Sequence, residues 1–208
     1  MATRRQEDKE KRRQEIVAVA AELFAAQGLE NVSFGDVAKK AGTSRSLVYF
    51  YFPNKESLLL AAVLETCERL HSLFHEASRG QGNGLDRIEA MGRAYLRFHL
   101  DHPAAFYLFA AHEARPDADE HSLQGRIALH KRVITQLVAQ TLREGIADGS
   151  ISERIPSPDI LSFCLWAFVH GMAQLVAMKQ ETLHACDVTP KQVVDKGFTL
   201  LLRALAPR

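Results

Sequence analysis

The stretch Ser33–Leu58, SFGDVAKKAGTSRSLVYFYFPNKESL, carries the strongest folding signals in this chain. Its first part predicts a short helix. Ser33 can cap that helix, and Asp36, three residues later, completes a capping box. The apolar residues that follow are spaced at i, i+3, i+4 and i+7, which places them on one helical face. They are Phe34, Val37, Ala38 and Ala41.

A tight turn and a second short helix come next in the same stretch. Gly42 suits the left-handed conformation that ends a helix, and Ser44 can cap the following one. Val48 and Phe52 share a face of that second helix and should be buried. A Pro-Asn break then opens a third helix. This order of segments is the pattern of a helix-turn-helix, whose second helix enters the major groove of DNA.

The outward side of the second helix carries the candidate DNA-binding residues Ser44, Arg45, Ser46, Tyr49, Phe50 and Tyr51. Arg45 lies near the helix start, where a guanidinium can donate two parallel hydrogen bonds to guanine; a phosphate contact or plain exposure is the alternative. The Tyr49 hydroxyl suits a phosphate. Phe50 could touch a thymine methyl group or deoxyribose, or pack against its own domain.

Further cations flank this helix. Lys55 falls in the first turn of the next helix, where the helix dipole and free backbone N–H groups favour a phosphate. Arg4 and Arg5 belong to the polar, charged segment Met1–Gln14. We expect this segment to begin as a mobile arm. Arg4 and Arg5 then enter the minor groove, meet the DNA backbone or stay solvated.

From Arg12 to Leu60 the chain resembles the DNA-binding domain of the tetracycline-repressor-like (TetR/AcrR) family of transcriptional regulators. The tail AGTSRSLVYFYFPNKESLL is the most specific part of the match, and residues of the leading helix and the turn also agree. These are Ile16, Ala20, Leu23, Phe24, Gly28, Val32-Ser33 and Val37-Ala38. The resemblance implies a DNA-binding head followed by a helical regulatory domain.

Composition agrees with a folded, soluble protein. The 208 residues are 47% apolar and 25% charged, which argues against disorder. The formal net charge is only +1, so the chain as a whole is not a generic polyanion binder. The three cysteines are widely spaced, and no secretory signal is evident, so we expect reduced thiols and a cytoplasmic location.

Helical periodicity continues to the end of the chain, whereas period-two alternation is lacking, so the predicted fold class is all-α with about nine helices. The breaker GQGNG at residues 80–84 separates two of them. Besides the helices of the head, we expect helices at residues 55–79, 85–100, 103–114, 119–147, 158–179 and 190–206. We place a helix-turn-helix domain at residues 1–54 and a regulatory domain at residues 55–208.

The segment Ile160–Met178 has no charged residue over 19 positions, the length of a membrane span. Polar residues interrupt it, so we expect a buried helix of a soluble protein that is covered by its own domain and by a second chain. The final helix carries a matching apolar stripe. The predicted dimerisation residues are Phe168, Met172, Leu175, Val194, Phe198, Leu201 and Leu205. The TetR resemblance implies the same interface.

The C-terminal half also resembles a subgroup of TetR regulatory domains, through Tyr95-Leu96-Arg97-Phe98, His102-Pro103 and a Trp-His-Gly motif at residues 166–171. The resemblance implies a pocket for a small lipophilic or amphipathic ligand. Its candidate lining is Phe98, His102, Phe106, Tyr107, Trp166 and His170. The alternative for each aromatic is solid core, and for His170 a structural, hydrogen-bonded imidazole.

No catalytic motif, metal site or cofactor site is predicted. His71 and His75 stand at i and i+4 on a helix but lack a third ligand at suitable spacing. The sequence therefore predicts a dimeric, DNA-binding regulator, and a repressor in particular. It would bind a pseudo-palindromic operator, and the TetR resemblance implies that it releases the operator on binding a ligand. The alternatives are a constitutive DNA-binding dimer without a pocket, and an all-α enzyme.

Overall fold

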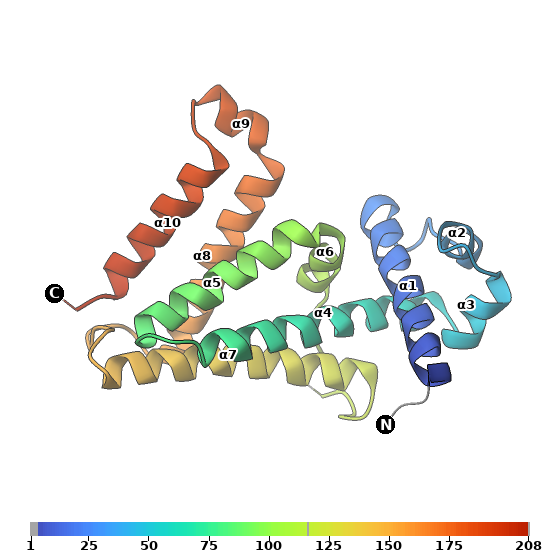
Figure 1. Ribbon diagram of the computed structural model, residues 1–208, viewed down its shortest axis with the longest axis horizontal. Helices are drawn as coiled ribbons and strands as arrows, with labels where there is room; N and C mark the ends of the chain where they lie inside the picture. Colours follow the sequence, from blue (N-terminus) through green and yellow to red (C-terminus); the bar gives the residue numbers. More distant parts are fainter. Residues whose placement is uncertain (1–3, 116, 208) are drawn as a thin grey trace. The chain divides into compact units, whose positions relative to one another are not determined.

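The computed structural model describes residues 4–115 and 117–207, and within them it contains ten α-helices and no β-strand (Figure 1). The helices are α1 (Arg4–Gln27), α2 (Phe34–Lys40), α3 (Arg45–Tyr51), α4 (Lys55–Ser78), α5 (Gly84–Asp101), α6 (Pro103–Ala111), α7 (Leu123–Ala147), α8 (Pro158–Met178), α9 (Gln180–Ala185) and α10 (Pro190–Leu205). The all-α prediction is confirmed. The helix beyond the expected nine is the short α9, which lies between α8 and α10.

The prediction of a mobile arm at the start of Met1–Gln14 is wrong for the described residues of that segment. Met1–Thr3 lie outside the described residues, but α1 is helical from Arg4 onward. Its first turns are rich in Arg, Lys and Glu, which favour helix, and they form ion pairs one turn apart. Arg12 pairs with Glu15 at 2.8 Å and Arg13 with Glu10 at 3.2 Å.

The connection between α6 and α7 is longer than predicted, because α6 ends at Ala111 and α7 begins only at Leu123. Ser122 accounts for the later start of α7. Its hydroxyl accepts a hydrogen bond from the Gly125 amide at 3.0 Å, so it satisfies one of the free N–H groups of the first turn.

The local predictions for α2 and α3 are confirmed. Ser33 and Asp36 form the capping box of α2, and the Ser44 side chain caps α3 by accepting from the Leu47 amide at 3.1 Å. Gly42 adopts a left-handed φ of +60° between the two helices. Val48 and Phe52 are buried.

The chain forms two compact units. The first comprises Met1–Glu68 with His102–His130, and the second comprises Arg69–Asp101 with Lys131–Arg208, so α4 and α7 each have residues in both. These units are defined by contacts between residues, and they do not test the domain boundary predicted between residues 54 and 55. That boundary stays a prediction.

In the first unit α1 packs against α2 and α6, and α2 packs against α3. The buried face of α1 supplies much of this core, with Ile16, Val17, Ala20, Ala21, Leu23 and Phe24. Val37 of α2 and Val48 of α3 are fully buried beside it. This packing holds the outward side of α3 on a rigid support.

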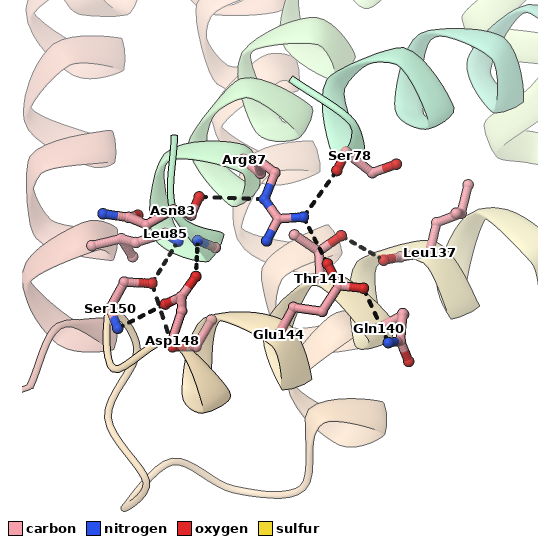
Figure 2. Close-up of polar contacts among 12 residues, drawn as sticks. Ser78, Asn83, Leu85, Arg87, Leu137, Gln140, Thr141, Glu144, Asp148 and Ser150 are labelled. Atoms are coloured by element: carbon pink, nitrogen blue, oxygen red, sulfur yellow. Dashed lines mark hydrogen bonds and ion pairs between the residues drawn. The ribbon is translucent and has the colours of Figure 1, made fainter. Parts of the chain in front are cut away.

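In the second unit α5, α8 and α10 pack together. The beginning of α5 also meets the end of α7 at two glycines. A Cβ atom added to Gly84 would lie 2.2 Å from the Gly145 Cα atom. Polar contacts surround this crossing (Figure 2): the Asp148 carboxylate accepts from the Gly84 amide at 2.8 Å, and the Ser150 hydroxyl accepts from the Leu85 amide at 3.1 Å.

Candidate nucleic-acid interface

The outward side of α3 exposes the residues predicted to meet DNA. Arg45 and Ser46 are exposed, and the exposed fractions of Tyr49 and Phe50 are 48% and 68%. Large aromatic side chains are seldom so exposed without a binding role when they stand together. The outward side of α3 therefore presents a guanidinium, two hydroxyl groups and two aromatic rings to solvent, where a ligand such as DNA could contact them.

Arg45 and Tyr49 form a pair on this surface. The Arg45 Nη2 atom donates to the Tyr49 hydroxyl at 3.3 Å, and the guanidinium carbon lies 5.5 Å from the ring centroid. Tyr49 is held in turn by the Phe34 ring, edge-on at 4.7 Å. A guanidinium has five N–H donors, so this bond leaves others for a base or a phosphate.

Ser44 is used within the protein. Its hydroxyl caps α3 and also lies 3.0 Å from the Ser46 hydroxyl. Ser46 therefore presents a hydroxyl that is already oriented by its neighbour. The capping bond satisfies a helix N–H group, which costs helix stability if it is removed.

Tyr51 and Phe50 are connected to α1. The Tyr51 hydroxyl donates to the Lys9 carbonyl oxygen at 3.2 Å, and the Lys9 ammonium lies 5.2 Å from the Phe50 ring centroid. Arg4 and Arg5, also predicted to meet DNA, are exposed on the first turn of α1. Lys9 was not among the predicted DNA-binding residues, because its contacts with Phe50 and Tyr51 join residues about 40 positions apart.

Lys55 begins α4 as predicted, but its ammonium also has a structural contact. The Nζ atom donates to the carbonyl oxygens of Leu29 and Glu30, at 3.0 and 3.2 Å. Lysine has three N–H donors, so one remains for a phosphate. The same side chain thus anchors the loop between α1 and α2.

A cleft of about 1290 Å³ adjoins the interface within the first unit. Arg45, Tyr49 and Lys55 line it together with residues of the segment after α6, including His112 and Arg115. Among the described residues that line it, none is one of the six predicted ligand residues.

Electrostatics in this unit support a stable scaffold. Hydrogen bonds from the Ser33 hydroxyl and amide hold the pKa of Asp36 below its usual range, so the capping carboxylate stays charged. Burial raises the pKa of Glu65, and the charge of Arg13 opposes that rise. The Arg13–Glu65 pair, at 2.8 Å, connects α1 to α4.

The six predicted ligand residues divide between the two units. His102, Phe106 and Tyr107 belong to the first unit, and Phe98, Trp166 and His170 belong to the second. Phe98 and Phe106 are buried, whereas Tyr107 and Trp166 have exposed fractions of 58% and 48%.

A polar cluster in the second unit includes two of those residues. The buried Tyr95 hydroxyl accepts from the Trp166 indole N–H at 2.8 Å and lies 3.0 Å from the His170 Nδ1 atom. The Gln174 amide lies 3.1 Å from the other ring nitrogen of His170. Burial lowers the pKa of His170. Tyr95 was missed as a site residue, since its partners lie more than 70 positions away in the chain.

The predicted dimerisation residues differ in exposure. Phe168 and Leu175 are exposed on α8, at 41% and 39%, while Val194 and Leu201 on α10 are half-buried. Met172, Phe198 and Leu205 are buried within their own chain. Leu200, 64% exposed on α10, did not belong to the predicted stripe.

α8 is the one helix in the described part of the chain that is long and apolar enough to cross a membrane by composition alone. Six of its residues pack into the second unit: Ser162, Leu165, Val169, Met172, Ala173 and Val176. Its other side remains apolar and uncovered, with Ile160, Phe163 and Met178 strongly exposed. Apolar residues on both sides are typical of a helix that is covered on two sides, by its own chain and by a partner.

Comparison with known proteins gives two family matches. Residues 16–62 match the model described as "Bacterial regulatory proteins, tetR family", and residues 88–205 match the model described as "Tetracyclin repressor-like, C-terminal domain". The second match alone covers more than half of the chain. The finer resemblance to the Trp-His-Gly subgroup stays a prediction.

Individual relatives are more distant. The nucleoid occlusion factor SlmA of Haemophilus influenzae is 26% identical over 166 residues, covering 77% of this chain and 75% of the relative. The transcriptional repressor AcnR of Corynebacterium diphtheriae is 28% identical over 176 residues, covering 82% and 84%. The solved structure of the regulator FadR from Bacillus subtilis with stearoyl-CoA has a TM-score of 0.70 at 17% identity, covering 91% of this chain and 97% of that one, which shows a shared fold.

Proposed function

Because this chain belongs to the TetR family of bacterial DNA-binding transcriptional regulators, we propose that it is a dimeric repressor released from its operator by a small lipophilic ligand. The observation that carries the proposal is the outward side of α3. Arg45, Tyr49 and Phe50 are exposed together there, on a helix that is capped by Ser44 and buried on its opposite face. Family membership also excludes the enzyme alternative, since these proteins are regulators.

Two copies of α3, related by a two-fold axis, would enter successive major grooves of a pseudo-palindromic operator. Their half-sites should lie one helical turn apart, about 34–36 Å, or somewhat more. Arg45 would read guanine, while Tyr49 and the remaining donor of Lys55 would bind phosphates. Phosphate contacts fix the register, and base contacts supply the sequence preference.

The dimer would form through α8 and α10. Phe168 and Leu175 on the uncovered side of α8 provide apolar area that a second copy can bury. Burial against a second copy would also explain why the outward side of α8 is apolar. The proposed location of the protein is the cytoplasm, because operator DNA of a bacterium lies there.

The effector would bind in the C-terminal region. Trp166 offers exposed aromatic surface there, His170 offers hydrogen-bonding groups and Phe98 is part of the buried support, and the FadR structure contains stearoyl-CoA. The ligand need only bind better to the conformation that fits DNA poorly. Release is then a shift of population, and its size is set by the difference in ligand affinity between the two conformations.

The rival proposal is a constitutive DNA-binding dimer whose C-terminal aromatics are solid core. The SlmA relative favours keeping this rival, since its name describes a nucleoid occlusion factor rather than a ligand-controlled regulator. Both proposals share the same DNA interface. They differ in whether a small molecule changes DNA affinity.

Selection of binding sites from random DNA with the purified protein tests the DNA-binding proposal. We expect a pseudo-palindrome. Arg45→Ala should lose about 1–3 kcal/mol of discrimination at one base pair in each half-site. Lys55→Ala should weaken binding to all sequences alike and lower the slope of log K against log salt concentration by about one for each protomer of the dimer. Arg154→Ala, an exposed arginine outside the interface, is the matched control.

If Arg45→Ala weakens cognate and random DNA equally, Arg45 is a phosphate contact and the assigned base reader is wrong. Lys55→Ala needs a melting curve as well, because its side chain also bonds the carbonyl groups of Leu29 and Glu30. Loss of those charge-assisted bonds should lower the free energy of unfolding by about 1–3 kcal/mol. Affinity is therefore compared at a temperature at which both proteins remain folded.

Trp166 reports on the effector proposal, because it is the single tryptophan of the chain and its indole N–H bonds Tyr95. A lipophilic ligand near His170 should change Trp166 fluorescence and weaken operator binding at the same concentration. A library of lipophilic compounds that changes neither signal would favour the constitutive DNA binder.

A further inference from the structure

The first turns of α1 have a basic face. One turn before Lys9 on this face stands Arg5, and one turn after it stand Arg12 and Arg13. The carboxylates of the same segment, on Glu7, Asp8 and Glu10, fall on the other sides of the helix by this spacing. The face around Lys9 is therefore cationic, although the whole segment is close to neutral.

Two of these cations are already paired. Arg12 bonds Glu15 at 2.8 Å, and Arg13 bonds Glu65 at 2.8 Å. Lys9 forms no ion pair with any residue in 4–115 or 117–207, and its side chain is exposed. Its ammonium lies over the Phe50 ring instead, 5.2 Å from the centroid.

Three consecutive residues at the end of the recognition region contact α1. Phe50 lies under the Lys9 ammonium, the Tyr51 hydroxyl donates to the Lys9 carbonyl oxygen at 3.2 Å, and the Arg13 guanidinium lies 5.6 Å from the Phe52 ring centroid. These contacts join segments about 40 positions apart in the chain. They determine where the basic face lies relative to α3.

We propose that Arg5 and Lys9 of this basic face form a second DNA-contacting surface, in which Lys9, beside Phe50, binds a backbone phosphate. Tyr51 acts as a positioning residue, because it holds the Lys9 backbone against α3. The inference rests on the proposed function, since it assumes that α3 enters the groove.

The chemistry favours a phosphate over a base edge. An ammonium is a compact point charge on a flexible stem, so it neutralises a phosphate well but reads bases poorly. An exposed cation–π contact contributes only about 0.5–1 kcal/mol, so Lys9 can leave the ring for a phosphate at small cost. Phe50 would then keep its place through the edge-on Tyr51 ring, 5.3 Å away.

The test compares Lys9→Ala with Lys11→Ala. Both lysines are exposed on α1 two positions apart, and they face different sides of the helix. Alanine favours helix at either position, so α1 should persist. DNA affinity is measured by fluorescence anisotropy over a salt series, on the selected operator and on a random duplex, with circular-dichroism melting as a check on folding.

For Lys9→Ala we expect affinity at least about five- to tenfold lower at 0.1 M salt on both DNAs, and a salt slope smaller by about 0.9 for each protomer, or about 1.8 for the dimer that loses two phosphate contacts. Lys11→Ala should match the wild type, and Lys9→Arg should retain the affinity. Tyr51→Phe should lower affinity in the same direction as Lys9→Ala, and it should add no further loss when the two changes are combined.

Equal behaviour of Lys9→Ala and Lys11→Ala, while the wild type still prefers its operator, would overturn the inference and leave the proposed function standing. Additive losses from Tyr51→Phe and Lys9→Ala would show that Tyr51 meets DNA itself, which overturns its positioning role. A wild-type protein that prefers no sequence would contradict the proposed function instead.

Discussion

Arg45 lies along the Tyr49 ring before any DNA is bound, and this contact sets the conformation of the guanidinium. A long arginine side chain loses rotamer entropy when it binds, so a contact that already restricts it lowers that cost. Phe34 supports the Tyr49 ring from the protein side. At the scale of single residues the interface is thus preorganised, and Lys55 extends it while holding the loop that precedes α2.

His170 should make the stability of the protein depend on pH. Burial lowers the pKa of His170 in the folded protein, and burial together with the charge of His170 lowers that of His99. The unfolded chain has ordinary imidazoles of pKa about 6.5, so it binds more protons than the folded chain as the pH falls through that value. Stability should be fully present above about pH 7 and decrease towards pH 5.5.

Thermal melting between pH 7.5 and 5.5 measures this effect. His170→Gln should show a smaller decrease in melting temperature over the interval than the wild type, and the burial of His99 should contribute to the decrease that remains. His184→Gln, on the exposed side of α9, serves as the control. Identical pH dependence in the wild type and in His170→Gln would contradict the prediction.

At the scale of secondary-structure elements, close helix contacts in the second unit depend on glycine. Gly92 of α5 faces the Phe198 ring, and Gly197 of α10 faces the Met172 sulfur, each where a Cβ atom would come closer than 3 Å. The start of α5 and the end of α7 approach still more closely, at Gly84 and Gly145. Around this crossing, Arg87 bonds Glu144 at 2.6 Å and the Ser78 carbonyl oxygen at 3.1 Å (Figure 2).

Gly84→Ala should therefore destabilise the second unit. The added methyl group would meet backbone atoms of Gly145, at 2.2 and 2.5 Å, and the backbone cannot rotate away as a side chain can. We expect a loss of about 1–3 kcal/mol in the free energy of unfolding, measured by urea denaturation. Gly35→Ala is the control, since its Cβ would meet only the Ser33 hydroxyl at 3.4 Å. Equal stability of the two variants would show that α5 and α7 can separate freely.

At the scale of the whole molecule, the proposed dimer connects DNA binding with regulation. A pseudo-palindromic operator needs two recognition helices, and a single head would have only half the base contacts. α4 and α7 both have residues in the two compact units, and in the proposed mechanism α4, which follows the recognition helix, would be the element through which a ligand shifts the population of DNA-binding conformations. The uncovered side of α8 is where a second copy would bind.

Leu175→Glu should separate the dimer, because it would place a charge in an apolar interface. The leucine is 39% exposed in the single chain, so the monomer should stay folded. We expect the dimer dissociation constant to rise about a hundredfold or more, measured by analytical ultracentrifugation. Leu129→Glu, at a leucine of α7 with 44% exposure, is the matched control. A dimer that survives Leu175→Glu but not Leu129→Glu would move the interface away from α8.

The residues of the head that could be predicted act over short distances along the chain. Capping by Ser33 and Ser44, the left-handed turn at Gly42 and the burial of Val48 each depend on neighbours within a few positions. Such local signals were enough to identify the helix-turn-helix, the all-α class and the family. The earlier start of α1 also has a local cause, since its first turns are rich in residues that favour helix.

Only the tertiary structure decided which distant side chains meet. The Lys55 bond to Leu29, the Tyr51 bond to Lys9 and the contact of Tyr95 with His170 join residues 26, 42 and 75 positions apart. Their formation depends on how helices pack, and packing is set by the fit of whole faces rather than by any one residue. By itself the sequence determined that α3 forms as a short capped helix and predicted its role in DNA binding; the contacts of α1 with α3 decided which further cations stand beside it.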